Sequence, residues 1–199
     1  MKKSRQISIP VVVFLLLFSA IAYGITWTAN KRLTNNAGWS VEPAIAVDGS
    51  KIYVVWQDDT YKGDQIYFKK SGDAGVTWTT NKRFTNNPGG SYAPAIAVNG
   101  SNIYVVWVEW NTLGSYDEIY FKKSHDNGST WSANMNISNN PGTRSHSPAI
   151  AVDGSNIYVV WQDKTPPEGY AIYFKKSDDG GATWTTNKRL TQNVWGDLS

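Results

Sequence analysis

The sequence repeats itself three times, and this repeat restricts the chain to a small group of folds. The stretch Pro-Ala-Ile-Ala-Val, followed by Asp or Asn and then Gly-Ser, occurs at residues 43–50, 94–101 and 148–155. A tryptophan near the end of each unit recurs every 53 residues, at Trp78, Trp131 and Trp184. Self-similarity at such a period is typical of solenoids, propellers and arrays.

Each unit is expected to hold four short β-strands. Ala-Ile-Ala-Val is the first, and the following Asp-Gly-Ser or Asn-Gly-Ser predicts a tight hairpin turn. Ile-Tyr-Val-Val-Trp is the second, and its two apolar faces indicate a sheet packed between neighbours. Ile-Tyr-Phe-Lys-Lys and the region around Lys-Arg-Leu-Thr complete the unit. This pattern predicts an all-β fold of propeller blades, because an immunoglobulin-like sandwich needs about 100 residues.

A fixed turn separates the third and fourth strands of every unit. It reads Ser-x-Asp-x-Gly-x-Thr-Trp at residues 71–78, 124–131 and 177–184. An Asp side chain can accept bonds from backbone N–H groups of its own turn, and Gly permits a conformation that other residues avoid. The Trp is a large apolar group suited to the seam between blades. Because a catalytic residue need not recur three times in register, the turn is interpreted as structural.

This motif is the Asp-box, or bacterial neuraminidase repeat (BNR), and the chain resembles a sialidase-type β-propeller over nearly everything after Trp27. The resemblance implies that the boxes are structural and lie on the face away from an active site. The box residues are Ser71, Asp73, Gly75, Thr77, Trp78, Ser124, Asp126, Gly128, Thr130, Trp131, Ser177, Asp179, Gly181, Thr183 and Trp184.

The resemblance to sialidases does not extend to a complete catalytic set. The family implies three arginines around the substrate carboxylate, a Tyr nucleophile with a Glu partner, an Asp acid/base and an Arg-Ile-Pro-like motif, which is missing here. Arg32, Arg83 and Arg189 are repeat-equivalent on the predicted outer strand and so cannot converge on one pocket, which leaves Arg144 as the one unique arginine. No catalytic residue, cofactor or metal site is therefore assigned, since His125 and His146 also lack the spacing of a metal pair.

The chain is divided into six segments. We expect a signal peptide at residues 1–22, an extra outer-strand copy and linker at 23–42, three blades at 43–86, 87–138 and 139–193, and a tail at 194–199. The first segment has a basic start and an apolar run of 16 residues, which predicts export to the cell surface or medium. Left uncleaved, it would anchor the chain in a membrane.

Charge and blade number bear on the partners. After residue 22 the chain holds 16 Lys and Arg against 16 Asp and Glu, so no nucleic-acid partner is predicted. Closed propellers usually have about 4 to 8 blades, so three blades leave two apolar faces without neighbours. Either further C-terminal blades cover these faces, or two copies of the chain close a six-bladed ring.

Loop variation points to the face where a ligand would bind. The turns after the first and third strands are nearly identical among units, whereas the loops after the second and fourth strands differ. A rigid scaffold with variable loops is typical of recognition. Carboxylates beside aromatic rings suit a glycan, although the same acids could simply cap strand ends. The candidate residues are Trp39, Asp58, Tyr61, Tyr92, Glu109, Trp110, Tyr116, Arg144, His146 and Asp163.

Three functions remain open from the sequence. The first is a non-catalytic extracellular binding or surface module directed at carbohydrate. The second is part of an exo-α-sialidase or another glycoside hydrolase whose catalytic residues lie in further blades. The third is a structural repeat of the cell surface. The missing Arg-Ile-Pro motif and the single unique arginine favour the first and third.

Overall fold

The computed structural model describes residues 29–60, 63–111, 116–165 and 169–192. It divides the chain into a unit at residues 1–32 and a compact unit at residues 33–199. In the first unit, the described residues 29–32 have no regular secondary structure. The expectations for residues 1–22, Trp27, Tyr61 and residues 194–199 fall outside the described residues.

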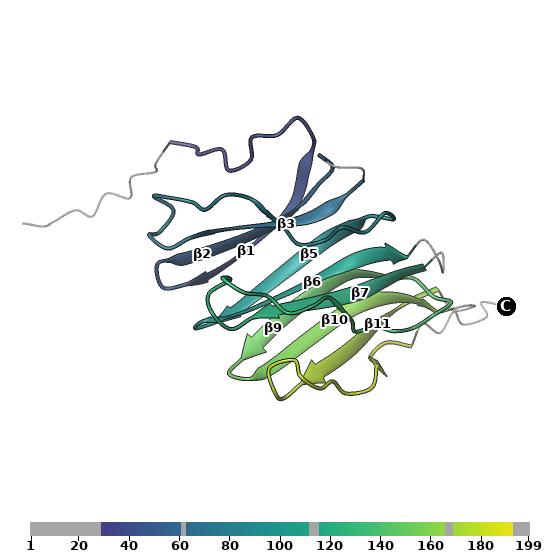
Figure 1. The fold of residues 1–199 in the computed structure, drawn as a ribbon. Helices are drawn as coiled ribbons and strands as arrows, with labels where there is room; N and C mark the ends of the chain where they lie inside the picture. The colour runs from purple at the N-terminus through teal and green to yellow at the C-terminus, as the bar shows by residue number, and fades with distance from the viewer. Residues whose placement is uncertain (1–28, 61–62, 112–115, 166–168, 193–199) are drawn as a thin grey trace, which may run out of the picture. The chain divides into compact units, whose positions relative to one another are not determined.

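The compact unit consists of three four-stranded antiparallel sheets, and this confirms the predicted all-β fold. Their strands follow one another in chain order: β1 (Ser40–Asp48), β2 (Lys51–Asp58), β3 (Gln65–Ser71) and β4 (Lys82–Arg83), then β5 (Ser91–Asn99), β6 (Asn102–Asn111), β7 (Tyr116–Ser124) and β8 (Met135–Asn136), then β9 (Ser145–Asp153), β10 (Asn156–Thr165), β11 (Gly169–Ser177) and β12 (Lys188–Arg189). We call the three sheets blade 1, blade 2 and blade 3. Figure 1 shows them following one another from purple to yellow.

The extra outer-strand copy expected within residues 23–42 does not form a strand in the described part of that segment that precedes Ser40. Residues 29–39 contain no strand, and the first strand begins at Ser40. β4, β8 and β12 each form by pairing with the third strand of their own blade. The expected extra strand has no such third strand preceding it among the described residues, so its backbone has nothing to pair with.

The first strand of every blade begins with a bulge. The pairing of β1 with β2 shifts register between Val41 and Ala44, and blades 2 and 3 show the same irregularity. At the bulge Glu42, Ala93 and Ser147 have φ values of 49°, 50° and 51°. A bulge re-aims the neighbouring side chains. The start of each inner strand is thus shaped to present side chains differently from the regular sheet.

The core lies between successive sheets. One cluster joins blades 1 and 2 around Phe68 and Trp107, and a second joins blades 2 and 3 around Phe121 and Trp161. β5 contacts both β1 and β9, so the first strands of the blades lie side by side on the inner edge. Across residues 29–192, with the gaps given above, no helix is of a length and hydropathy that could cross a membrane.

Candidate functional site

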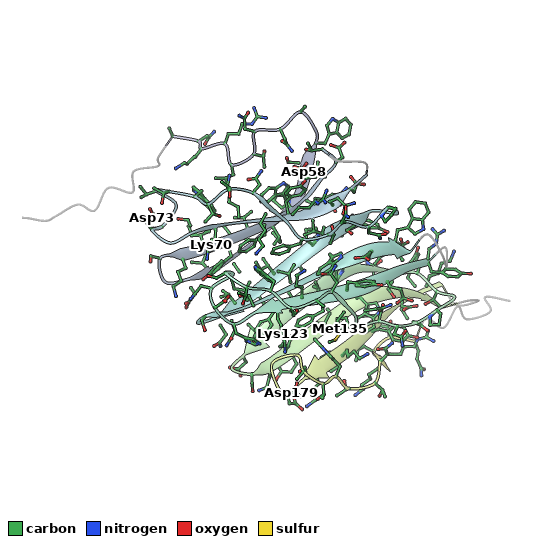
Figure 2. The ribbon with its side chains drawn as sticks, in the orientation of Figure 1. Asp58, Lys70, Asp73, Lys123, Met135 and Asp179 are labelled. Atoms are coloured by element: carbon green, nitrogen blue, oxygen red, sulfur yellow. The ribbon has the colours of Figure 1, made fainter. Side chains whose placement is uncertain are left out.

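The two ends of the blades differ in what they carry. Because the sheets are meanders, the turns after the first and third strands lie at one end, and the loops after the second and fourth lie at the other. Figure 2 shows the two ends of blade 1, with Asp73 at the left and Asp58 further to the right. We call these the turn end and the loop end.

At the turn end, the three Ser-to-Trp turns form the same hydrogen bonds. In blade 1 the Asp73 carboxylate accepts bonds from Ser71 Oγ at 2.7 Å, Thr77 N at 2.8 Å and Thr77 Oγ1 at 2.6 Å. Ser71 Oγ in turn accepts from Gly75 N at 2.9 Å. Asp126 and Asp179 repeat this arrangement. The carboxylates are therefore fully engaged within their own turns.

These hydrogen bonds lower the pKa of each turn carboxyl. Bonds from the Thr77 hydroxyl and N–H and from Ser71 bring the pKa of Asp73 down to about 2. The pKa values of Asp126 and Asp179 are lowered further by the equivalent Thr and Ser donors. A carboxylate stabilised in its ionised form by donors from its own turn serves the turn and not proton transfer at neutral pH.

The Gly and Trp of the turn also join one blade to the next. A Cβ on Gly181 would lie 2.7 Å from Phe121 Cζ of blade 2, and one on Gly128 would lie 3.0 Å from Phe68 Cζ of blade 1. The Trp131 ring lies 4.4 Å from the ring of Phe84, between centroids. Glycine is thus required for close approach as well as for positive φ.

At the loop end, two of the candidate carboxylates are buried and hydrogen-bonded inside their own blades. Asp58 Oδ2 accepts bonds from Trp56 Nε1 at 3.0 Å and Ser40 Oγ at 2.9 Å. Asp163 Oδ2 accepts from Ser145 Oγ at 3.0 Å, and also from Asn140 Nδ2 and Trp161 Nε1. Both carboxylates connect the second strand to the start of the first strand.

Glu109, at the equivalent position of blade 2, behaves differently. Its Oε2 accepts a bond from Trp107 Nε1 at 3.0 Å, and burial raises its pKa. The equivalent serine, Ser91, is buried, and its hydroxyl has no hydrogen-bond partner among the described residues. Glu109 is one methylene group longer than Asp58 and Asp163. In blade 2 the bond between this acid and the serine at the start of the first strand is not found among the described residues.

The most distinctive group at the loop end comes from two blades and centres on Asp117 at the start of β7. His146 Nε2 lies 3.4 Å from Asp117 Oδ2. The Tyr92 side chain interacts with the same carboxylate, and its ring centroid lies 6.4 Å from that of His146. Tyr170, from β11, flanks His146 with a centroid distance of 6.2 Å. We call these four residues the Asp117 cluster.

Charges around Tyr92 show what the cluster can do chemically. Burial, the hydrogen bond to Asp117 and the negative charges of Asp117 and Glu42 raise the pKa of Tyr92, against the opposing effect of Arg144. The hydroxyl therefore remains protonated at neutral pH. Glu42 Oε2 accepts a bond from Ala93 N at 2.9 Å, which links blade 1 to the same region.

The remaining candidates are aromatic or basic side chains at the surface of the loop end. Trp39, Trp110 and Tyr116 are 77%, 47% and 39% exposed, and Arg144 is exposed as well. The structure thus brings Tyr92 and His146 together with Arg144 nearby, while Asp58 and Asp163 stay buried within single blades.

Sequence reasoning missed Asp117 and Tyr170. They occupy the same place in the repeat, at the beginning of the third strand, where blade 1 has Asp64. The sequence signal that could have found them is the difference at this repeat position, which is Asp in two blades and Tyr in the third. Groups of three or more His, Cys, Asp or Glu side chains able to hold a metal are absent from the residues that the structure describes.

Comparison with known proteins supports the fold. The chain is similar to a Hadza microbial sialidase, with a TM-score of 0.59 and 17% identity over 73% of this chain and 36% of that one. It is also similar to Penicillium chrysogenum alpha-L-arabinanase complexed with arabinobiose, with a TM-score of 0.60 and 17% identity over 78% and 51% of the two chains. Trypanosoma rangeli sialidase gives a TM-score of 0.53 and 13% identity over 83% and 31%.

No family model matches the sequence, and no curated protein matches it either. The chain spans between 31% and 51% of the length of the three structures above. At this level of identity the similarity shows the fold alone. The compact unit of this chain is therefore an all-β array of three consecutive four-stranded blades with a β-propeller fold similar to that of these sialidases and the arabinanase.

Proposed function

We propose that this chain is a non-catalytic carbohydrate-binding protein whose ligand binds at the loop end, over the Asp117 cluster. The observation that carries the proposal is the junction of Tyr92, Asp117 and His146, which joins two blades through side chains at repeat positions that differ from blade to blade. A structural device of the repeat would use the same residues in every blade, as the Ser-to-Trp turns do.

The chemistry of this region suits a sugar. Tyr170 and Trp110, each 47% exposed, offer flat apolar faces to sugar C–H groups. The partly exposed His146 imidazole and the exposed Arg144 provide donors and acceptors for hydroxyl or carboxylate groups, and the buried Asp117 carboxylate holds the imidazole in place. A few fixed polar groups among aromatic side chains are the usual composition of a small-molecule site.

Two observations favour binding over catalysis. The raised pKa of Tyr92 disfavours the phenolate that a Tyr nucleophile needs. Asp58 and Asp163 are buried and engaged by Trp and Ser donors of their own blades, which leaves them poorly placed to act on a bound glycoside. We also propose that the Ser-to-Trp turns are Asp-boxes and that residues 1–22 direct export, so that the ligand would be met outside the cell.

A glycoside hydrolase is the second candidate, with further blades supplying the remaining groups. The raised pKa of Glu109 favours it, because a general acid needs a carboxyl that stays protonated near neutral pH. Fluorogenic sialosides and arabinosides test this candidate directly. Turnover by the unaltered chain that disappears in Glu109→Gln would replace the binding proposal with the enzymatic one.

A glycan array with the fluorescently labelled chain tests the binding proposal. We expect one class of glycan to bind, and Trp110→Ala and Asp117→Asn each to weaken that binding about tenfold or more, the size of an ordinary hot-spot loss. Trp78→Ala is the matched control, because it removes a half-exposed Trp at the turn end. A blank array, or equal weakening by all three variants, would refute carbohydrate binding at the loop end and leave a purely structural repeat.

A further inference from the structure

The two blade-to-blade interfaces inside the chain are copies of one another. Each joins the trailing face of one blade, meaning the sheet face towards the next blade, to the leading face of the blade that follows. The trailing sides are Tyr53, Val55, Phe68 and Phe84 in blade 1 and Tyr104, Val106, Phe121 and Ile137 in blade 2. The leading sides are Ile103, Val105, Trp107 and Trp131 in blade 2 and Ile157, Val159, Trp161 and Trp184 in blade 3.

A lysine bond repeats along with the apolar contacts. Lys70 Nζ donates to Asn127 O across the first interface at 2.6 Å, and Lys123 Nζ donates to Gly180 O across the second at 2.8 Å. The equivalent residue of blade 3 is Lys176, which pairs with Asp178 of its own turn at 2.9 Å. In blade 3 the lysine thus takes a carboxylate of its own turn in place of the carbonyl that a following blade would supply.

The same side chains recur on the two outer sheet faces of the unit. The trailing face of blade 3 carries Tyr158, Val160, Phe174 and Leu190. Leu190 is 50% exposed, whereas its equivalents Phe84 and Ile137 are 8% and 2% exposed inside the two interfaces. The trailing face of blade 3 therefore carries residues equivalent to those on the trailing faces of blades 1 and 2, but it is less buried than they are.

The leading face of blade 1 is uncovered along β1, whereas Val54 and Trp56 of β2 are buried. Ile45 and Val47 are 64% and 56% exposed, whereas Ile96, the equivalent of Ile45 in blade 2, is 9% exposed. Beside them a cavity of about 160 Å³ opens between Leu33, Val41, Val54 and Trp56. The outer faces of the unit are thus the two halves of an interface that the chain already forms twice.

We propose that blade 3 of one copy docks on blade 1 of a second copy, and that the reciprocal contact closes a ring of two chains. Closed propellers have about 4 to 8 blades, and a ring made only of three-bladed copies must contain a multiple of three. Six is the one multiple in that range, so closure requires two copies. Head-to-tail contacts of this kind give a ring when the rotation closes and a filament when it does not.

Closing the ring would replace a short segment around Leu33 of one copy by the segment around Leu190 of the other, which has the same sequence. Lys69 Nζ donates to Leu33 O at 2.6 Å, as Lys175 Nζ donates to Ile137 O at 2.7 Å. Leu33 therefore holds, on blade 1, the place that the outer strand of a preceding blade would take. Leu190 of the second copy would compete for this place, and since both stretches read Lys-Arg-Leu-Thr, either can fill it with the same contacts.

Light scattering after size exclusion of residues 23–199, which include the whole compact unit, tests the proposal. We expect the mass of two chains for the unaltered protein and of one chain for Val47→Arg and Leu190→Arg, each at an exposed apolar position of one outer face. Val76→Arg is the matched control, because Val76 is exposed and its equivalents Ser129 and Ala182 are exposed inside the array. It should leave the dimer intact.

Cross-linking identifies the contact itself, because the chain has no cysteine of its own. Ala74 supplies the carbonyl equivalent to those of Asn127 and Gly180, so a short bismaleimide should join Lys176→Cys to Ala74→Cys when the two variants are mixed. Neither variant alone should be joined to itself. A monomer at every concentration, a filament, a dimer that survives both face variants, or cross-linking of one variant alone would overturn the proposal.

Discussion

The turn end and the loop end of the blades show two different uses of one repeat. At the turn end, Asp73, Asp126 and Asp179 accept the same Ser and Thr donors in all three blades. At the loop end, Asp58 and Asp163 accept bonds from equivalent Trp and Ser donors, whereas Glu109 accepts from its Trp while Ser91 has no partner among the described residues. Asp117, in addition, joins two blades. The comparison teaches that local hydrogen bonding repeats with the sequence, whereas contacts between distant segments change with single substitutions.

The largest expected effect lies in the seam that the turn end forms between blades. Trp131→Ala should destabilise the fold by about 3 kcal/mol, because it removes a large ring packed against Phe68 and Phe84. Trp78→Ala should cost about 1 kcal/mol, since no aromatic contact to an earlier blade is found for Trp78 among the described residues. Urea unfolding measures the free energy lost in both variants, in the Val47→Arg background so that self-association does not contribute. Equal losses would contradict the claim that Trp131 stabilises the contact between blades.

A second test separates the conformational strain of the Ser-to-Trp turn from the contact of this turn with the preceding blade. Gly75 and Gly181 have φ values of 89° and 80°, so alanine strains both turns by about 1 kcal/mol. Gly181→Ala should cost about 2 kcal/mol more, because its Cβ would lie 2.7 Å from Phe121 Cζ, whereas the atoms nearest to a Cβ on Gly75 are 3.7 Å away. The same urea experiment compares the pair. A similar loss for both would mean that the turn conformation alone demands glycine.

The loop end can be made more alike between blades by one substitution. Glu109→Asp should stabilise the chain by about 1 kcal/mol, because the shorter side chain places an acceptor for the buried Ser91 hydroxyl, as Asp58 does for Ser40 at 2.9 Å. Asp163→Glu should be destabilising by a similar amount of about 1 kcal/mol. Thermal unfolding of the two variants checks the sign. A loss from Glu109→Asp would show that the longer acid is required at this position.

The smallest effect is an acid dependence of the turn end. The pKa of Asp73 is lowered to about 2, so its ionised form stabilises the fold above the unfolded value near about 4 and that contribution disappears as the pH falls through 2. Stability should be constant above about pH 5 and decline below it. Asp126→Asn should flatten part of this decline, whereas Asp178→Asn, outside the Ser–Asp–Thr bonds, should not. Urea midpoints between pH 2 and pH 6 measure the difference.

Much of the fold was predictable from local pattern. The hairpins, the Ser-to-Trp turns and the alternation of strands depend on residues close together in the sequence, and the structure agrees with them. The extra N-terminal strand was wrong for its described part, because a strand needs a neighbour that residues 29–34 do not have there. Tyr92 and His146 were candidates, whereas Asp117, which connects them, was not.

The amino-acid sequence by itself determined the repeat, the four strands of each blade and the clasped turn, because these arise from backbone conformation and contacts within a few residues. Only the tertiary structure decided that Gly181 lies against Phe121, that Ser91 lacks an acceptor and that Asp117 meets His146. The physical reason is that these outcomes depend on distances between segments 18 or more residues apart. Such distances are set by how one sheet packs on the next.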